Sequence, residues 1–140
     1  MRLYLDSSAI AKRAVTEYES ETMERYLESA SASASILVAS AMAWVEVGRV
    51  IRGGLDRSGT APAELSGLLD RAFAGVSEAP VSAQVVSLAR RIGPPTLRSL
   101  DAIHLATATL IDADVVVAYD QRLLQIAEEL GFATASPGAR

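Results

Sequence analysis

The stretch Arg98-Ser-Leu-Asp-Ala-Ile-His-Leu-Ala-Thr-Ala108 decides how this chain folds. Placed on a helix, its apolar side chains surround the axis almost completely, which is typical of a helix buried on most sides. Asp101 nevertheless lies in the first turn, and His104 follows one turn later on the same face. Ser99 is the predicted N-cap, which would place Asp101 near the positive end of the helix dipole. This acid either compensates the dipole or belongs to a cation site completed by other carboxylates.

The composition limits the chemistry available to the chain. Its 140 residues are enough for one domain with a substantial core, and 50% of them are hydrophobic. The chain has no cysteine and a single histidine, which excludes disulfides, thiolate metal sites, cysteine nucleophiles and His-rich zinc sites. Any bound metal must therefore be held mainly by oxygen.

Charge and hydropathy indicate the compartment and the kind of partner. A charge interrupts the N-terminus before a signal-peptide segment can form, and the longest apolar stretch, around residues 36–45, is shorter than the ~20 residues of a membrane span. A cytoplasmic protein is therefore expected. The net charge of −4 differs from that of a nonspecific nucleic-acid binder. Because Lys12 is the only lysine, a local phosphate-binding patch would consist mainly of arginine.

Predicted strands alternate with predicted helices along the whole chain. The strands are expected at residues 2–6, 36–39, 115–119 and 132–134, with a weak candidate at 79–81. The helices are expected at residues 9–14, 19–30, 41–52 (ending at Gly53-Gly54), 63–74, 83–92, about 98–113, and 122–130. The β-branched run at 115–119 lacks alternation, as a central parallel strand does. This order predicts an α/β fold with a parallel sheet in an αβα sandwich, and one domain over residues 1–140 with a polar tail from about 135.

Four acidic residues occupy positions that could bring them together. Asp6 and Asp120 each follow a predicted strand, and the carboxyl ends of parallel strands form the ligand-binding edge of such a sheet. Glu46 borders the apolar face of the helix at 41–52, and Asp101 opens the buried helix. If these carboxylates converge, their repulsion would raise their pKa values unless a cation neutralised them. Mg²⁺ or Mn²⁺ is the ion that suits oxygen ligands of this kind.

Each acid also has a simpler explanation. Asp6 and Asp120 are good N-caps for the helices that follow, and capping is the expected role of either one alone. Glu46 alone would pair with Arg49 on its own helix, and Asp101 alone would serve the helix dipole. The joint pattern favours a shared site, because two strands end on Asp and a nearly apolar helix opens on one.

Four segments of the chain carry a family resemblance: Leu5-Asp-Ser-Ser-Ala9, the helix that contains Glu46, the run from Leu97 to Ala108, and Tyr119-Asp-Gln-Arg-Leu123. They resemble the signature segments of PIN-domain ribonucleases, and more narrowly those of the VapC toxins of bacterial toxin–antitoxin pairs. The resemblance spans the chain from Arg2 to about Gly131, and the Leu-Asp-Ala-Ile-His-Leu-Ala-Thr-Ala run is its most specific part.

The resemblance implies a fold, a site and an activity. The family has a parallel five-stranded sheet in which the strands ending at Asp6 and Asp120 lie side by side. Its four-acid set falls here on Asp6, Glu46, Asp101 and Asp120. These acids would bind one or two Mg²⁺ or Mn²⁺ ions. The implied activity is hydrolysis of RNA phosphodiesters by metal-activated water, which leaves a 5′-phosphate and a 3′-hydroxyl.

Other polar residues near the acids would support them. Many family members carry threonine two residues before the last acid, where this chain has Ala118, so a supporting hydroxyl is either missing or supplied by Ser7 or Ser8. His104 has Asp101 on its face and otherwise apolar neighbours, which favours a structural, hydrogen-bonded role over catalysis.

Basic residues lie close in sequence to the acids and could contact RNA phosphates, although a single arginine often pairs with a nearby glutamate instead. The candidates for phosphate contact are Lys12, Arg13, Arg49, Arg98 and Arg122. The resemblance also implies a homodimer that a VapB-like antitoxin inhibits by forming a heterotetramer or a larger assembly with it. The antitoxin is expected along an apolar groove near the helices at 19–30 and 41–52.

Three other interpretations stay open. A phosphoacceptor receiver domain also gathers acids at strand ends, but it uses a lysine late in the sheet, and Lys12 is early in this chain. A phosphatase of the haloacid dehalogenase type would need a second Asp two residues after Asp6, where Ser8 stands. A PIN-like domain that binds RNA or protein without cleaving it would have no need of the four acids.

Overall fold

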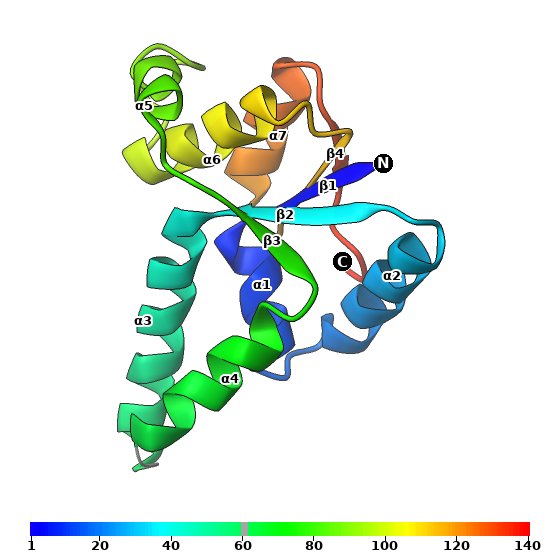
Figure 1. Ribbon diagram of the computed structural model, residues 1–140, viewed down its shortest axis with the longest axis vertical. Helices are drawn as coiled ribbons and strands as arrows, with labels where there is room; N and C mark the ends of the chain where they lie inside the picture. Colours follow the sequence, from blue (N-terminus) through cyan, green and yellow to red (C-terminus); the bar gives the residue numbers. More distant parts are fainter. Residues whose placement is uncertain (60–61) are drawn as a thin grey trace.

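The computed structural model describes residues 1–59 and 62–140, and its strands and helices alternate along the chain (Figure 1). The elements are β1 (Arg2–Leu5), α1 (Ser7–Ala14), α2 (Ser20–Ala32), β2 (Ile36–Ser40), α3 (Ala41–Ser58), a 3₁₀ turn η1 (Pro62–Glu64), α4 (Leu65–Ala72), β3 (Val76–Ala79), α5 (Ala83–Ala89), α6 (Ser99–Leu110), β4 (Val115–Val117), α7 (Gln121–Glu129) and β5 (Ala133–Ala135).

The five strands form one parallel sheet in the order β3-β2-β1-β4-β5. In this order β1 lies between β2 and β4, and Leu5 at its end pairs with Val117 at the end of β4. The residues that follow these two strands therefore leave the sheet at neighbouring points of the same edge. This arrangement confirms the predicted five-stranded parallel sheet.

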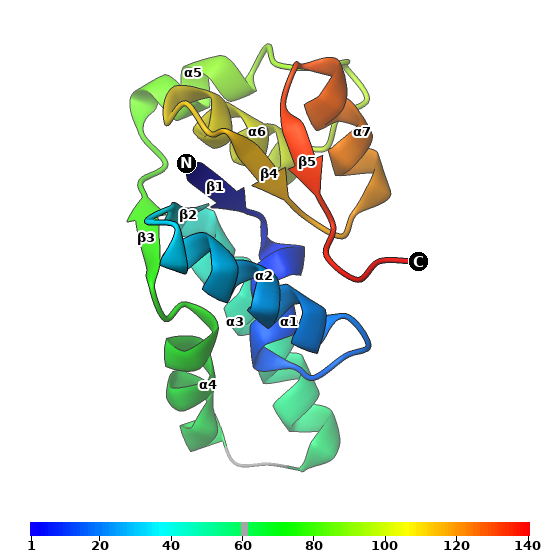
Figure 2. The same cartoon turned by 90° about the vertical axis from the view of Figure 1, so that its right-hand side faces the viewer.

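Helices cover both faces of the sheet, which confirms the αβα sandwich. Side chains of β1 alternate between the faces: Leu3 and Leu5 belong to the apolar cluster formed with α1 to α4, and Tyr4 belongs to the cluster formed with α6 and α7. The same split separates Val117 from Val116 on β4. Figures 1 and 2 show α5, α6 and α7 on one side of the sheet and α1 to α4 on the other.

Helix α6 has the buried character that its sequence predicts. Its fully or nearly buried residues are Ala102, His104, Leu105, Ala106, Thr107 and Ala108. The prediction that Ser99 caps this helix is wrong, because the extended backbone ends at Arg98 and Ser99 is already the first helical residue. Arg98 makes no side-chain cap bond, so the first turn depends on Asp101 for favourable charge at its positive end.

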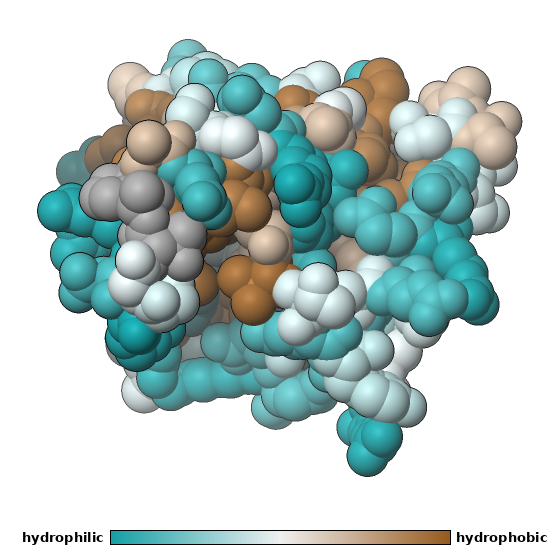
Figure 3. Space-filling view, turned by 90° about the horizontal axis from the view of Figure 1, so that it is seen from below, coloured by the Kyte–Doolittle hydropathy of each residue, from teal (hydrophilic) through white to brown (hydrophobic). Residues whose placement is uncertain are grey.

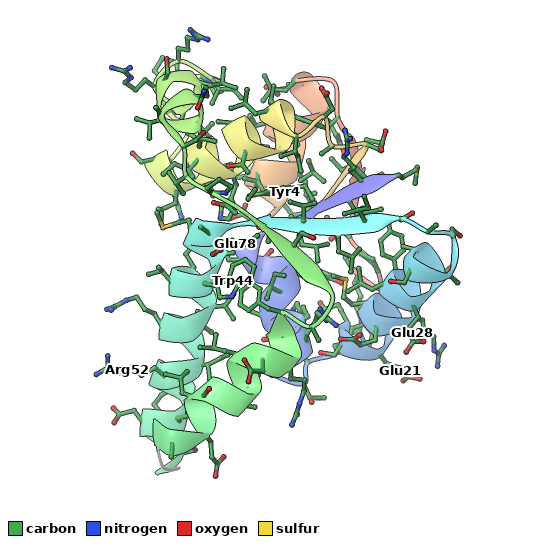
Figure 4. The ribbon with its side chains drawn as sticks, in the orientation of Figure 1. Tyr4, Glu21, Glu28, Trp44, Arg52 and Glu78 are labelled. Carbon is green, nitrogen blue, oxygen red and sulfur yellow. The ribbon has the colours of Figure 1, made fainter. Side chains whose placement is uncertain are left out.

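The predicted end of α3 at Gly53-Gly54 is also wrong, since the helix continues to Ser58 and ends at Gly59 in a left-handed conformation (φ 70°). A glycine inside a helix costs roughly 1 kcal/mol, which tertiary packing can outweigh. Ile51 and Leu55 supply part of that packing, since both contact the apolar cluster formed with α1 to α4. Near the start of α3, Trp44 (Figure 4) stacks on Phe73, with 3.7 Å between the ring centres.

Several smaller boundaries also differ from the sequence-based expectation. β3 ends at Ala79, where the weak candidate strand was expected to begin, because Pro80 has no N–H with which to continue the ladder. α5 ends at Ala89, three residues before the expected position, and α4 covers only Leu65–Ala72 of the helix expected at 63–74. None of these differences moves the four acids along the sheet edge.

The predicted polar tail is packed against the sheet rather than loose. β5 pairs with β4, and beyond it the Ser136 hydroxyl donates to the carbonyl of Ala118 at 2.8 Å. The Tyr119 hydroxyl donates to the carbonyl of Pro137 at 2.7 Å. These bonds bring the end of the chain back to the carboxyl end of β4.

Within residues 1–59 and 62–140, none of the helices combines the length and the hydropathy needed to cross a bilayer.

Candidate active site

Asp6 leaves β1 and caps α1. Its Oδ1 accepts hydrogen bonds from the Ala9 amide at 2.9 Å and from the Ser8 hydroxyl at 2.6 Å, and the residue is only 5% exposed. Burial raises the pKa of Asp6 from 3.8 to about 6, although the bonds from Ser8 and Ala9 oppose the shift; the charge of Glu46 adds to it. Asp6 is thus a carboxylate whose charge is poorly solvated.

Asp120 comes three residues after the end of β4, because the strand ends at Val117 and not at residue 119 as expected. Its Oδ1 accepts from the amides of Arg122 at 2.9 Å and Leu123 at 3.1 Å and so caps α7. The capping expected of Asp6 and Asp120 is therefore confirmed, but it uses one oxygen of each carboxylate. Within the described part of the chain, no hydrogen bond engages the Oδ2 atom of either residue. Capping and metal ligation are compatible at both positions.

Glu46 projects from α3 toward α6. Its Oε1 lies 2.6 Å from Nε2 of His104, and its Oε2 accepts from the Ser7 hydroxyl at 3.1 Å. Burial pushes the pKa of Glu46 upward, but the bonds from His104 and Ser7 outweigh it and lower the pKa. The predicted pairing with Arg49 is wrong: among the ion pairs of the described residues, the partner of Glu46 is His104.

His104 is 1% exposed and uses both ring nitrogens. Nδ1 lies 2.6 Å from the hydroxyl of Tyr4, and Nε2 faces Glu46. Because a carboxylate only accepts, the neutral ring carries its proton on Nε2, and Nδ1 then accepts the Tyr4 O–H. The hydrogen-bonded role predicted for His104 is confirmed. The expectation that its neighbours other than Asp101 are apolar is wrong, since its partners are Tyr4 and Glu46 from distant parts of the chain.

Asp101 lies partly buried in the first turn of α6. Burial raises its pKa, the charge of Asp120 raises it further, and the charges of His104 and Arg98 act in the opposite direction. His104 itself has a raised pKa, because the bond and charge of Glu46 outweigh the effect of burial. The two acids that follow β1 and β4 and the two acids on α3 and α6 therefore lie within electrostatic reach of one another at one edge of the sheet.

The chemistry of these donors fits a hard divalent ion. Among the described residues, no three His, Asp or Glu side chains are already spaced to share one metal ion directly. Mg²⁺ does not require such a cage, because it usually keeps several waters and binds through one or two carboxylates. Asp6 and Asp101 have raised pKa values, and a nearby cation would stabilise the charged form of both carboxylates. Metal binding by the four acids stays a prediction.

Serine hydroxyls contact two of the acids. Ser8 donates to Asp6 and accepts from the amide of Tyr119 at 2.9 Å, so it links the ends of β1 and β4. Ser7 donates to Glu46. Ala118 is fully buried and contributes no hydroxyl. Of the two alternatives raised by Ala118, the structure favours hydroxyl support from Ser7 and Ser8.

Two of the five predicted phosphate contacts, Lys12 and Arg13, are bound by groups of the protein itself. Arg13 donates to Glu24 at 3.0 Å and to the carbonyls of Ala72 and Ala74 at 2.9 and 2.8 Å, and its side chain is 12% exposed. The ammonium of Lys12 is bound by Glu17 and Glu19. The side chains of Lys12 and Arg13 therefore connect α1 to other parts of the protein. The glutamates bound to them would compete with a phosphate.

The other three arginines keep solvent-accessible positions. Arg122 donates to the carbonyl of Thr96 at 2.8 Å, at an exposed site near the start of α7. Arg98 precedes α6 and influences the pKa of Asp101. Arg49 lies one turn beyond Glu46 and lines a cavity with Arg52. Phosphate binding by Arg49, Arg98 and Arg122 stays a prediction.

We expect Asp6→Asn to stabilise the metal-free protein at about pH 7, by up to roughly 3 kcal/mol for a pKa raised from 3.8 to about 6. The folded state binds the Asp6 proton more tightly than the unfolded state does. The free energy of unfolding therefore decreases as the pH rises from about 4 to about 6 and this proton is lost. Asparagine removes that contribution and retains a capping oxygen.

The measurement is urea unfolding of both proteins with EDTA across this pH range. The difference in unfolding free energy is expected to shrink as the pH falls below about 4, where Asp6 is protonated in both states. A difference that does not change with pH would contradict the raised pKa.

Comparison with known proteins places these features in a family. The sequence matches the PIN domain family over residues 3–129. It is 40% identical to ribonuclease VapC47 of Mycobacterium tuberculosis over 139 residues, which cover 98% of both chains. It is also 40% identical to ribonuclease VapC46 of the same species, over 96% of this chain and 97% of that one.

Solved structures with the same fold agree with this placement. The VapBC2 complex of Rickettsia felis, bound to a DNA fragment from its promoter, aligns with a TM-score of 0.72 at 13% identity and covers 96% of this chain and 98% of that one. Mycobacterium tuberculosis VapC20, a toxin that cleaves the sarcin–ricin loop, aligns with a TM-score of 0.68 at 18% identity, over 96% and 99%. At these identities the likeness shows the fold alone. The family match and the two full-length relatives show that the chain belongs to the PIN-domain family, as a relative of the VapC ribonucleases.

Proposed function

We propose that this protein is an endoribonuclease that cleaves RNA with Mg²⁺ or Mn²⁺ and acts as the toxin of a toxin–antitoxin pair. The observation that carries the proposal is the gathering of four acids at one sheet edge: Asp6 and Asp120 follow adjacent parallel strands, and Glu46 and Asp101 come from the helices beside them. The VapC relatives, which are named ribonucleases, support the same activity.

Each acid has a distinct task in this proposal. Asp6, Asp101 and Asp120 would hold the metal with the carboxylate oxygens that capping leaves available. A bound Mg²⁺ or Mn²⁺ lowers the pKa of water and stabilises negative charge on a phosphodiester during hydrolysis. Glu46 would bind the metal through water or orient the attacking water, because His104 and Ser7 fix both of its oxygens. Arg49, Arg98 and Arg122 would contact the RNA phosphates.

The test is cleavage of RNA by the purified protein with and without divalent ions. We expect cleavage with Mg²⁺ or Mn²⁺, loss of cleavage with EDTA, and recovery when Mn²⁺ is added in excess. The products are expected to carry a 5′-phosphate and a 3′-hydroxyl. Cleavage that continues in EDTA would contradict the metal assignment. RNA binding without cleavage under any metal would favour the PIN-like binding domain instead.

We further propose a VapB-like antitoxin as partner. The Rickettsia felis neighbour is a VapBC complex, which supports a partner of this kind. A cavity of about 670 Å³ lies between α3 and the start of α4, and its lining residues are Arg49, Arg52, Gly53, Leu55, Asp56, Gly59 and Leu65. Figure 3 shows hydrophobic side chains in a hollow on the lower face of the molecule, and Figure 4 shows Arg52 pointing away from the core. This cavity lies between α3 and α4, whereas the sequence analysis expected the antitoxin groove near α2 and α3. The homodimer is likewise a proposal.

A further inference from the structure

A second cavity, of about 480 Å³, opens near the end of β4 and includes both sequence neighbours of Asp120. Its lining residues are Lys12, Tyr18, Glu19, Tyr119, Gln121, Ala139 and Arg140. It adjoins the candidate active site, because Tyr119 precedes Asp120 and its amide donates to the Ser8 hydroxyl at 2.9 Å. The same hydroxyl donates to Asp6 at 2.6 Å. The backbone of Tyr119, which lines the cavity, is thus linked through one serine to Asp6, the residue that follows β1.

The charges of this cavity cancel, which disfavours phosphate as its ligand. The ammonium of Lys12 is bound by Glu17 and Glu19, at 3.0 Å from Oε2 of Glu19. The guanidinium of Arg140 lies over the ring of Tyr18, and its charge also acts on Glu19. Two cations therefore stand against two carboxylates. A phosphate entering here would gain little from the cations and would be repelled by the glutamates.

The neutral parts of the cavity suit a flat aromatic ligand. Tyr18 is 66% exposed although Arg140 lies 4.0 Å from its ring centre, so the ring keeps an open surface. Tyr119 is fixed by its bond to Pro137 and by the Lys12 ammonium, 4.9 Å from its ring centre. Tyrosine rings are the usual platforms on which proteins stack unpaired nucleobases. The exposed amide of Gln121 offers a donor and an acceptor for a base edge.

We propose that this cavity is a nucleobase subsite, in which the base of a nucleotide near the cleaved phosphodiester stacks on Tyr18 and Tyr119 and meets Gln121 at its edge. The subsite rests on the proposed ribonuclease function. It would bind single-stranded RNA, because a base paired in a helix cannot present its face to a tyrosine. The arginines near α3, α6 and α7 would bind the phosphates, and this cavity would add affinity through the base.

The first test compares Tyr18→Ala with Tyr18→Phe in the Mn²⁺-loaded enzyme acting on a short single-stranded RNA. We expect Tyr18→Ala to raise KM about tenfold while kcat changes little, and Tyr18→Phe to restore KM because it keeps the ring. Glu28→Gln, at an exposed position of α2, controls for a change of surface polarity. An unchanged KM in Tyr18→Ala, or a KM that Tyr18→Phe fails to restore, would overturn the base-stacking proposal.

The second test measures binding without cleavage, in the Asp6→Asn protein. Adenosine and uridine 5′-monophosphates are titrated against ribose 5-phosphate, and the tyrosine ring resonances are followed by NMR. We expect the nucleotides to shift the Tyr18 and Tyr119 signals and ribose 5-phosphate to leave them in place. Equal shifts from ribose 5-phosphate, or none from the nucleotides, would overturn the subsite. Failure of the ribonuclease proposal has a different signature: the wild-type protein cleaves no RNA, whatever the nucleotide titration shows.

Discussion

Asp6→Asn is expected to lower RNA cleavage at least about a hundredfold and to leave the fold intact. The asparagine oxygen can still accept from Ser8 and Ala9, so α1 keeps its cap. What the variant loses is the negative charge that would hold the cation. The measurement is kcat/KM for an RNA oligonucleotide at saturating Mn²⁺, with the thermal midpoint of both metal-free proteins recorded in EDTA.

In this variant kcat/KM should fall and the thermal midpoint of the metal-free protein should rise. The reason is that the Asp6 charge, which would hold the cation, is poorly solvated when no metal is bound. A variant that misfolds would lose activity and stability together. Glu28→Gln removes an equal charge from α2, where Figure 4 shows Glu28 pointing outward, and is expected to change neither. Cleavage by the Asp6→Asn protein at the same rate as the wild-type protein would show that the site has been assigned incorrectly.

His104→Ala is expected to lower both the stability and the activity. The substitution empties a site that is 1% exposed and removes the partner of the Tyr4 hydroxyl and of Glu46. We expect the free energy of unfolding to fall by about 3 kcal/mol, because a cavity and an unpaired buried hydroxyl both contribute. Cleavage is expected to fall roughly 10- to 100-fold, as it does when groups that orient a metal ligand are lost.

Tyr4→Phe separates the positioning of Glu46 from packing. It keeps the ring, which is fully buried, and removes only the hydroxyl that fixes the orientation of His104. We expect a loss of about 1 kcal/mol in stability and a rise in the Mn²⁺ concentration needed for half-maximal cleavage. If both variants lose stability and the metal dependence of cleavage does not change, His104 serves packing alone.

The features that the sequence predicts correctly are those encoded within one element. The helix from Ser99 to Leu110 is apolar on nearly every side, and its burial follows directly from that pattern. The strands before Asp6 and Asp120 are short and apolar and alternate with helices, and this alternation was enough to predict a parallel sheet. The end of α3 could not be predicted in the same way, because Leu55, beyond Gly53, packs against an apolar cluster whose other members are distant in the sequence.

The features that sequence reasoning missed depend on pairs far apart in the chain. His104 meets Glu46 across 58 positions and Tyr4 across 100, and no local pattern around His104 indicates either partner. The same holds for Arg13, whose guanidinium is held by carbonyls about 60 positions away. A run of basic residues beside an acid looks the same in the sequence whether it faces RNA or a neighbouring helix.

Asp6 combines two duties in one side chain: it starts α1 and carries charge at the edge of the sheet. Asparagine performs the first duty and not the second, and the two amino acids differ by a single nucleotide in their codons. Under the proposed toxin function, cells that escape by mutation would therefore have a short route to a protein that folds, persists and still binds the proposed antitoxin without harming the cell. Selection for survivors of toxin expression is expected to return this substitution repeatedly.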